Sequence, residues 1–244
     1  MINTLKKTLD SFVNSPLLIL YSVLSDIAFL IVYTSAGNIF SELIGNRVAN
    51  YSPTLTKNLS LYGISSLFTL EMFFILIFIL AGLLFSYAIY CVFQGLSWWL
   101  AFKIVKQKTK FSEYLKNFFK INAVWLVAYA LYSINDYFLV FRQKLAPEEF
   151  IITKYPLLIL FVFVVLLAIT SYVFQNISKA ISFISKNFFL FLKSFSFVLL
   201  LLFLVDRFLV LLRFNQEIQL FAGLLSVFLT FAFSRVFLIK SFKM

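Results

Sequence analysis

Polar and ionisable side chains interrupt several long apolar stretches of this sequence. A charged side chain at the centre of a bilayer costs about 2.5 to 3.5 kcal/mol on insertion scales, so such residues usually pair with one another or serve a function. The candidates share a polar side chain and a position inside or beside an apolar run: Asp26, Glu71, Asn135, Asp136, Asp206 and Arg207. We expect these six residues to form one intramembrane polar cluster.

Two kinds of chemistry fit such a cluster. Buried carboxyl groups can relay protons or bind a cation, because lost solvation favours the protonated form and a shared site lets protons move. The structural alternative is a clasp, in which Arg207 neutralises an aspartate of a neighbouring helix and the other groups are hydrogen-bonded. Asp206 and Arg207 project about 100° apart on a helix, so we do not expect them to pair with each other. We favour the clasp, with a transport site as the alternative.

Lysines gather in two segments that separate apolar runs, 102–120 and 176–194, where aromatic and aliphatic residues stand between them. The lysines concerned are Lys103, Lys106, Lys108, Lys110, Lys116, Lys120, Lys179, Lys186 and Lys193. This pattern predicts basic amphipathic helices on a membrane surface, where each lysine adds about 1 kcal/mol of attraction to anionic lipid. The nine lysines are therefore predicted to bind lipid, and the simpler alternative is that they only set the topology.

The residues needed for common enzymatic sites are missing. The chain has no histidine and a single cysteine, Cys91, so it has neither the commonest general base nor a zinc site of the usual kinds. No glycine-rich phosphate loop or Gly-x-Ser-x-Gly motif is present. We predict a protein that is not an enzyme, with no metal, no cofactor and no protein partner that its sequence identifies.

The elements that carry these residues are predicted to be membrane helices. The chain is 62% hydrophobic and 13% charged, whereas a soluble domain is roughly 45 to 50% apolar and about 25% charged. Six apolar runs are predicted to cross a bilayer: Leu17–Ala36, Leu67–Leu96, Asn122–Phe141, Pro156–Gln175, Phe195–Leu212 and Leu220–Ile239. They leave no room for a soluble domain, so residues 1–244 are predicted to form one all-α transmembrane domain.

The charges of the links predict the orientation of this domain. The net charge of +11 comes mostly from lysines in the short links, which favours contact with the anionic inner leaflet of a membrane over binding to nucleic acid. The lysine-rich segments and both ends of the chain fall on one side of the six crossings, whereas the other side carries fewer basic residues. We predict a multi-pass protein of the cell membrane with both termini in the cytoplasm.

An internal repeat links the polar and basic features. Lys-Asn-Phe-Phe at 116–119 returns at 186–189, and each copy is followed twenty residues after its first lysine by an aspartate, Asp136 or Asp206. A weaker copy leads to Asp26. The sequence therefore predicts three degenerate two-helix units, about 1–100, 101–175 and 176–244, each opened by an interfacial amphipathic helix. The long polar links are predicted at 38–66 and 142–155.

Two known families share parts of this pattern. Three two-helix units with amphipathic helices resemble mitochondrial carriers, but the Pro-x-Asp-x-x-Lys/Arg motif of that family is absent. The order of interfacial helix, crossing, long outer link and crossing resembles the membrane domain of glycerophosphodiester phosphodiesterases and similar small six-helix inner-membrane proteins. Together these observations predict a non-enzymatic membrane scaffold or lipid-interacting protein. The alternative is a small proton- or cation-coupled transporter that uses the acidic residues.

Overall fold

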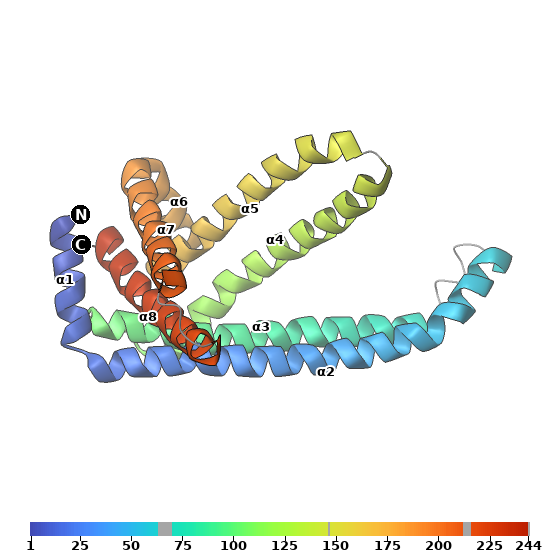
Figure 1. Ribbon diagram of the computed structural model, residues 1–244, viewed down its shortest axis with the longest axis horizontal. Coiled ribbons are helices and arrows are strands. Elements are labelled where there is room, and N and C mark those ends of the chain that lie inside the picture. The colour runs from blue at the N-terminus through green and yellow to red at the C-terminus, as the bar shows by residue number, and fades with distance from the viewer. Residues whose placement is uncertain (63–69, 146, 212–215, 244) are drawn as a thin grey trace. The chain divides into compact units, whose positions relative to one another are not determined.

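The computed structural model describes residues 1–62, 70–145, 147–211 and 216–243, and every regular element within these ranges is an α-helix (Figure 1). The all-α fold class is therefore confirmed. The helices, in chain order, are α1 (Ile2–Val13), α2 (Pro16–Tyr62), α3 (Leu70–Ile104), α4 (Phe111–Leu145), α5 (Pro147–Phe174), α6 (Ile177–Lys186), α7 (Phe188–Leu211) and α8 (Gln216–Lys243).

Four helical segments are long and apolar enough to cross a membrane within the described ranges: Pro16–Asn50, Phe73–Ile104, Phe188–Val210 and Leu220–Lys243. A fifth span is possible if Leu158–Phe174 and Ile177–Lys186, which meet at a bend of 110°, act together. Large apolar side chains along these segments are exposed, including Leu76, Ile159 and Phe221. A surface of this kind is typical of helices surrounded by lipid.

Several helices extend beyond the predicted crossings. The predicted polar link at 38–66 is wrong as far as Tyr62, because α2 continues through it. The spacing of Phe40, Leu43 and Ile44 follows the helical period, and Gly45 alone does not end a helix. The predicted link at 142–155 is also mostly helical, since α5 begins at Pro147 rather than Pro156. Proline fits the first position of a helix because the N–H it lacks would have no partner there.

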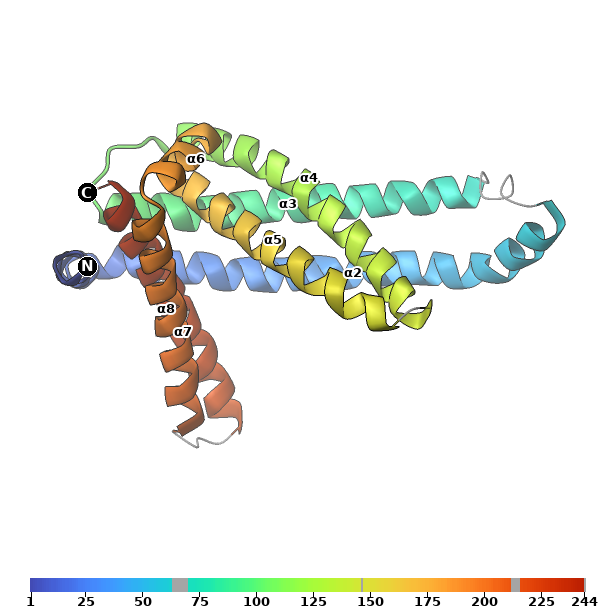
Figure 2. The ribbon, with the colours of Figure 1, turned by 90° about the horizontal axis from the view of Figure 1, so that it is seen from above.

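The chain divides into two compact units, of which the smaller comprises residues 26–94. It contains most of α2 and α3, which run side by side as an antiparallel pair (Figures 1 and 2). Phe40 packs against Phe85 and against Gly82, where an added Cβ would lie 3.2 Å from the Phe40 ring. Near the other end of the pair, Phe29 meets Tyr90 edge to face. Aromatic contacts and one close approach at a glycine thus hold this hairpin together.

The larger unit comprises residues 1–25 and 95–244. Two helical hairpins, α4 with α5 and α7 with α8, contribute to it, while α1 packs along α8 and α6 lies against α5 (Figure 2). Its buried side chains concentrate at the end of α3, the start of α4, the end of α5, in α6 and in the second half of α8. These elements carry or border the lysine-rich segments, so the core of this unit lies next to its basic residues.

The helix ends in this unit have identifiable causes. The helix α1 stops at Val13, and α2 starts with Pro16 at its first position. Between α5 and α6, Gln175 adopts a positive φ of 54° and Asn176 caps α6, because its side-chain oxygen accepts the Lys179 N–H at 3.0 Å. A side-chain cap satisfies one of the N–H groups that the first turn of a helix leaves free. The chain can therefore turn sharply at 175–176 and still start a stable helix.

The two copies of Lys-Asn-Phe-Phe differ in local structure. The copy at 116–119 lies inside α4 and buries Phe118. The copy at 186–189 straddles the break between α6 and α7 and leaves Phe188 exposed. The two segments thus place matching residues in different surroundings, and the repeat stays a prediction from the sequence.

Candidate functional site

The predicted polar cluster is described for three of its six side chains. Asp26 is only 1% exposed, and its Oδ1 accepts a hydrogen bond from Gln94 Nε2 at 3.2 Å. Both residues belong to the smaller unit and join α2 to α3. A carboxylate that accepts an amide N–H across two apolar helices ties them together, which is the arrangement that a clasp requires.

Asp206 and Arg207 behave differently from the expectation. Arg207 Nε lies 3.9 Å from Asp206 Oδ2, with the side chains 62% and 68% exposed respectively. The expectation that these neighbours would not pair is therefore wrong. The long, flexible Arg207 side chain can reach Asp206 although the Cα–Cβ bonds of the two residues diverge. The Arg207 guanidinium also lies 5.0 Å from the Phe203 ring centroid. Local pairing lowers the cost of exposing both charges to an apolar surrounding.

Glu71, Asn135 and Asp136 have side chains outside the described part of the chain. For the cluster residues whose side chains are described, the structure pairs Asp26 with Gln94 and Asp206 with Arg207. The six-residue cluster itself stays a prediction.

All nine lysines predicted to bind lipid belong to the larger unit, and none of them is buried. The predicted single amphipathic helix at 102–120 is wrong, however, because α3 ends at Ile104 and α4 begins at Phe111. Lys106 ends the helical path with a φ of 62°, and this residue, Lys108 and Lys110 lie in the intervening link. The close spacing of the lysines there disfavours a helix, since like charges three and four residues apart repel each other.

Aromatic residues fix this link to the rest of the larger unit. Trp99 Nε1 donates a hydrogen bond to the Thr109 carbonyl oxygen at 3.0 Å, and its ring meets that of Phe111 edge to face. The Lys103 ammonium lies 5.1 Å from the centroid of the Trp99 ring, in cation–π range. The basic link at 105–110 is therefore fixed against the larger unit by these contacts.

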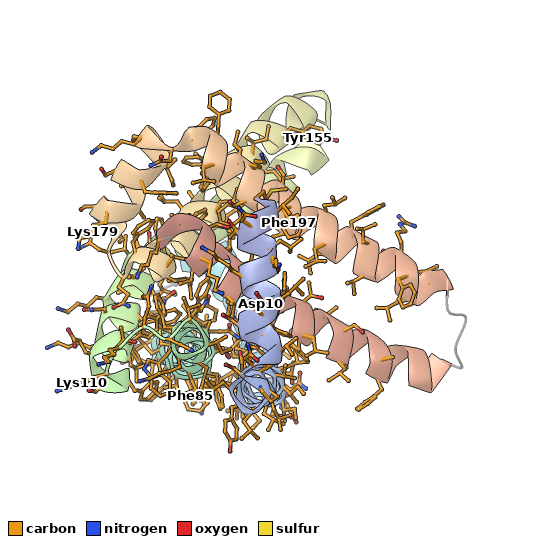
Figure 3. All side chains as sticks on the ribbon, turned by 90° about the vertical axis from the view of Figure 1, so that its left-hand side faces the viewer. Asp10, Phe85, Lys110, Tyr155, Lys179 and Phe197 are labelled. Carbon is orange, nitrogen blue, oxygen red and sulfur yellow. The ribbon has the colours of Figure 1, made fainter. Side chains whose placement is uncertain are left out.

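The second half of α8 joins the basic segments to one another. The Phe242 ring lies 4.8 Å from the Phe183 ring of α6 and 6.0 Å from the Phe195 ring of α7, measured between centroids. Two residues before Phe242, Lys240 Nζ donates to the Lys7 carbonyl oxygen and to Ser11 Oγ of α1. Figure 3 shows Lys110 and Lys179 at the same edge of this unit, both extending away from the helices. We call this region, which comprises α1, residues 103–120, α6, the start of α7 and the end of α8, the basic end.

The expected polar residues did not include Arg235, which the structure buries to 7% exposure. Its Nη1 donates to Ser22 Oγ at 3.4 Å, and its guanidinium lies 6.0 Å from the Trp98 ring centroid. Ser97 Oγ donates to the Ser22 carbonyl oxygen at 3.4 Å. An arginine, two serines and a tryptophan thus join the start of α2, the end of α3 and α8.

A second buried pair that was not expected joins α4 to α5. Tyr172 Oη donates a hydrogen bond to Asn122 Oδ1 at 2.6 Å, and Asn122 Nδ2 donates to the Phe118 carbonyl oxygen at 2.8 Å. The Tyr172 ring packs against Phe118 at 4.6 Å and against Trp98 at 5.7 Å, between centroids. Aromatic packing therefore surrounds this polar contact.

A signal for these residues was present in the sequence. Arg235 stands in the apolar run Phe-Ala-Phe-Ser-Arg-Val-Phe-Leu-Ile, and the rule that selected Asp206 selects it too. A basic residue near the C-terminal lysines also fits a role in membrane orientation. Asn122 opens a predicted crossing, where an amide is unremarkable, and nothing in the sequence pairs it with Tyr172.

The described groups offer polar contacts and positive charge. No group of three or more Cys, Asp or Glu side chains that could hold a metal ion occurs among the described residues. Comparison of the chain with protein-family models, curated proteins and solved structures gave no match. The functional argument therefore depends on the buried polar contacts and the basic end.

Proposed function

We propose that this chain is a non-enzymatic, multi-pass protein of the cell membrane that binds anionic phospholipids through the lysines of its basic end. In this proposal six helices cross the bilayer in three degenerate two-helix units, and both termini are cytoplasmic. The buried polar contacts hold the helices together, and the lysines attach the protein to the inner leaflet, where it serves as a scaffold or lipid-interacting protein.

The observation that carries the proposal is the gathering of separate basic segments in one unit. Lys243 Nζ donates to Gln107 Oε1 at 3.3 Å, which joins the end of α8 to the link after α3. The contact of Phe242 with Phe183 joins the same end of α8 to α6. Segments that are distant in the sequence thus present their lysines together, as a surface on an anionic leaflet would require.

The pairings of the acidic residues support the structural role over the transport role. Asp26 contacts a glutamine amide, and Asp206 contacts its own neighbour Arg207. A hydrogen bond between helices stabilises their packing, whereas the pair of Asp206 and Arg207 neutralises charge within α7. We therefore assign Asp26 to the stability of the helix pair and Asp206 to local charge neutralisation.

Lipid retention by the purified protein tests the proposal. Native mass spectrometry in mild detergent would compare phosphatidylglycerol with phosphatidylcholine of the same acyl chains. We expect the native chain to prefer phosphatidylglycerol, and a variant with all nine predicted lysines changed to glutamine to lose at least about tenfold in that affinity, since each lysine contributes about 1 kcal/mol.

A control for basic residues of the opposite side of the membrane changes Arg47, Lys57 and Lys154 to glutamine, because the sequence places these three residues there. The control should keep the preference to within about threefold, a difference of less than 1 kcal/mol. Equal retention of the two lipids by the native chain would contradict the proposal.

A further inference from the structure

Lys243 occupies a defined position at the basic end. Its Nζ lies 4.5 Å from the centroid of the Phe102 ring and 3.3 Å from Gln107 Oε1. Phe102 is buried near the end of α3, and Gln107 belongs to the link that follows. The ammonium group is therefore held by an aromatic face and an amide oxygen, and its orientation is set before any ligand arrives.

Two other lysines belong to the same part of the larger unit. Lys103 follows Phe102 directly in α3, and its ammonium is held over the Trp99 ring at 5.1 Å from the centroid. Lys179, in the first turn of α6, lies close enough to Lys243 for the two positive charges to repel each other. Lys243 of α8 is thus within electrostatic reach of Lys179 of α6, and Lys103 of α3 is the sequence neighbour of the Phe102 ring that holds Lys243.

The structure gives these cations no carboxylate partner within its described ranges. The described carboxylates of the larger unit are Asp10, Glu113 and Asp206, and none of them forms an ion pair with Lys103, Lys179 or Lys243. Bringing like charges together is unfavourable unless an anion lies between them. The arrangement has the positive charge and the hydrogen-bond donors that a phosphate group requires.

Exposed apolar groups that follow Lys179 along the chain indicate that the phosphate belongs to a lipid. Ile181 of α6 is 49% exposed, and Phe189 at the start of α7 is 86% exposed. A free phosphate would leave these side chains in contact with water, whereas the acyl chains of a phospholipid would cover them.

We propose that Lys103, Lys179 and Lys243 form a specific site for the phosphate of an anionic phospholipid head group. The site deepens the proposed function and depends on it, because it lies within the lysine-bearing surface but binds one lipid at fixed residues. Gln107 orients Lys243, and Trp99 and Phe102 position the two ammonium groups.

The test compares two triple variants of the full chain in mild detergent. The site variant carries Lys103→Gln, Lys179→Gln and Lys243→Gln, and the control carries Lys116→Gln, Lys120→Gln and Lys193→Gln, three exposed lysines with the same change in charge. Native mass spectrometry would follow the first phosphatidylglycerol that binds. We expect the control to lose only the diffuse attraction of three surface lysines, and the site variant to bind this lipid at least about tenfold more weakly than the control.

Two further measurements keep the result interpretable. If the site variant does not elute as a single folded species, the single variant Lys179→Gln replaces it. This variant should bind the lipid about fivefold more weakly, because Lys179 is exposed and contributes about 1 kcal/mol of attraction. Inorganic phosphate in excess should leave the bound lipid in place. Complete displacement by inorganic phosphate would overturn the lipid site in favour of a site for free phosphate.

The remaining outcomes separate the two proposals. Equal weakening in the site variant and the control would overturn the specific site and leave the diffuse lysine surface intact. A native chain that binds phosphatidylglycerol no better than phosphatidylcholine would overturn the proposed function, and the site with it.

Discussion

At the scale of single residues, the structure separates polar groups that hold helices together from polar groups at the surface. Asn122 and Tyr172 are both 4% exposed and satisfy each other. Asp206 and Arg207 are exposed and pair only with each other among the described residues. Because a buried polar group without a partner costs far more than an exposed one, the first pair should matter more for stability.

Replacement of Tyr172 by phenylalanine tests this distinction. The change removes the hydroxyl group that donates to Asn122 Oδ1, so we expect the free energy of unfolding to fall by about 1 to 3 kcal/mol. Tyr155→Phe is the matched control, because Tyr155 is 60% exposed, and it should stay within about 0.5 kcal/mol of the native value. Reversible unfolding in mixed micelles, followed by ellipticity, would give both values.

A double variant separates the hydrogen bond from other effects of these changes. Asn122→Leu with Tyr172→Phe removes donor and acceptor together, and the loss should be smaller than the sum of the two single losses. Strict additivity would show that the contact between Asn122 and Tyr172 does not couple α4 to α5.

The sequence located polar residues better than it located their partners. Asp26 was predicted inside the apolar region from its neighbours alone, and it is buried. Its contact with Gln94 joins residues 68 positions apart, and periodicity within one helix carries no information about the neighbouring helix. For the same reason Arg235 could have been recognised as buried, but not as a partner of Ser22.

At the scale of elements, helix ends decide where the basic residues are presented. The break between α5 and α6 turns the chain by 110° and places Lys179 and Lys186 on a short helix of their own. This helix buries Ala180 and Ile184 against the rest of the unit. The cap at Asn176 should therefore contribute to the stability of α6 and to the position of its lysines.

Replacement of Asn176 by alanine tests the role of this cap. The Lys179 N–H would lose its acceptor, and we expect a loss of about 1 kcal/mol in the free energy of unfolding, within a range of about 0.5 to 2 kcal/mol. Asn176→Asp keeps an oxygen acceptor and should retain most of the stability. Hydrogen exchange of the α6 amides, measured by mass spectrometry, should rise in the alanine variant alone. A rise of the same size in the aspartate variant would exclude capping as the cause.

Element types were predictable from the sequence, and element ends were less so. Long apolar runs predicted helices correctly, because their length and composition fit few other structures. The predictions misplace the ends at Tyr62 and Pro147 because they treat polar residues as links, and they miss the end at Ile104 because they treat the lysine-rich segment after it as helix. A helix continues through polar residues whenever its backbone hydrogen bonds remain satisfied, so polarity alone does not mark its end.

At the scale of the whole molecule, the proposed orientation has a direct test. In that orientation Asp10, Lys110 and Lys179 of the larger unit all lie on the cytoplasmic side. The sequence places Lys57 and Lys154 on the opposite side. Cys91 is fully buried, so the native chain should react little with a membrane-impermeant maleimide.

Single cysteines at these five positions should fall into two groups. We expect the cysteines at 10, 110 and 179 to react only in inside-out vesicles, and those at 57 and 154 only in right-side-out vesicles, because the hydrocarbon core excludes the charged reagent. The native chain is the background control. Reaction of the first group from both sides would contradict a fixed orientation with cytoplasmic termini.

The contact of α1 with α8 has a consequence for the biosynthesis of the chain. Ser11 and Lys240, which it joins, are separated by 229 residues. While the chain emerges from the ribosome, α1 is made long before α8 exists, and its Phe12 has no Phe233 to pack against. The newly made N-terminal segment must therefore be held by lipid or by another factor until translation of α8, and only then can the two helices close together.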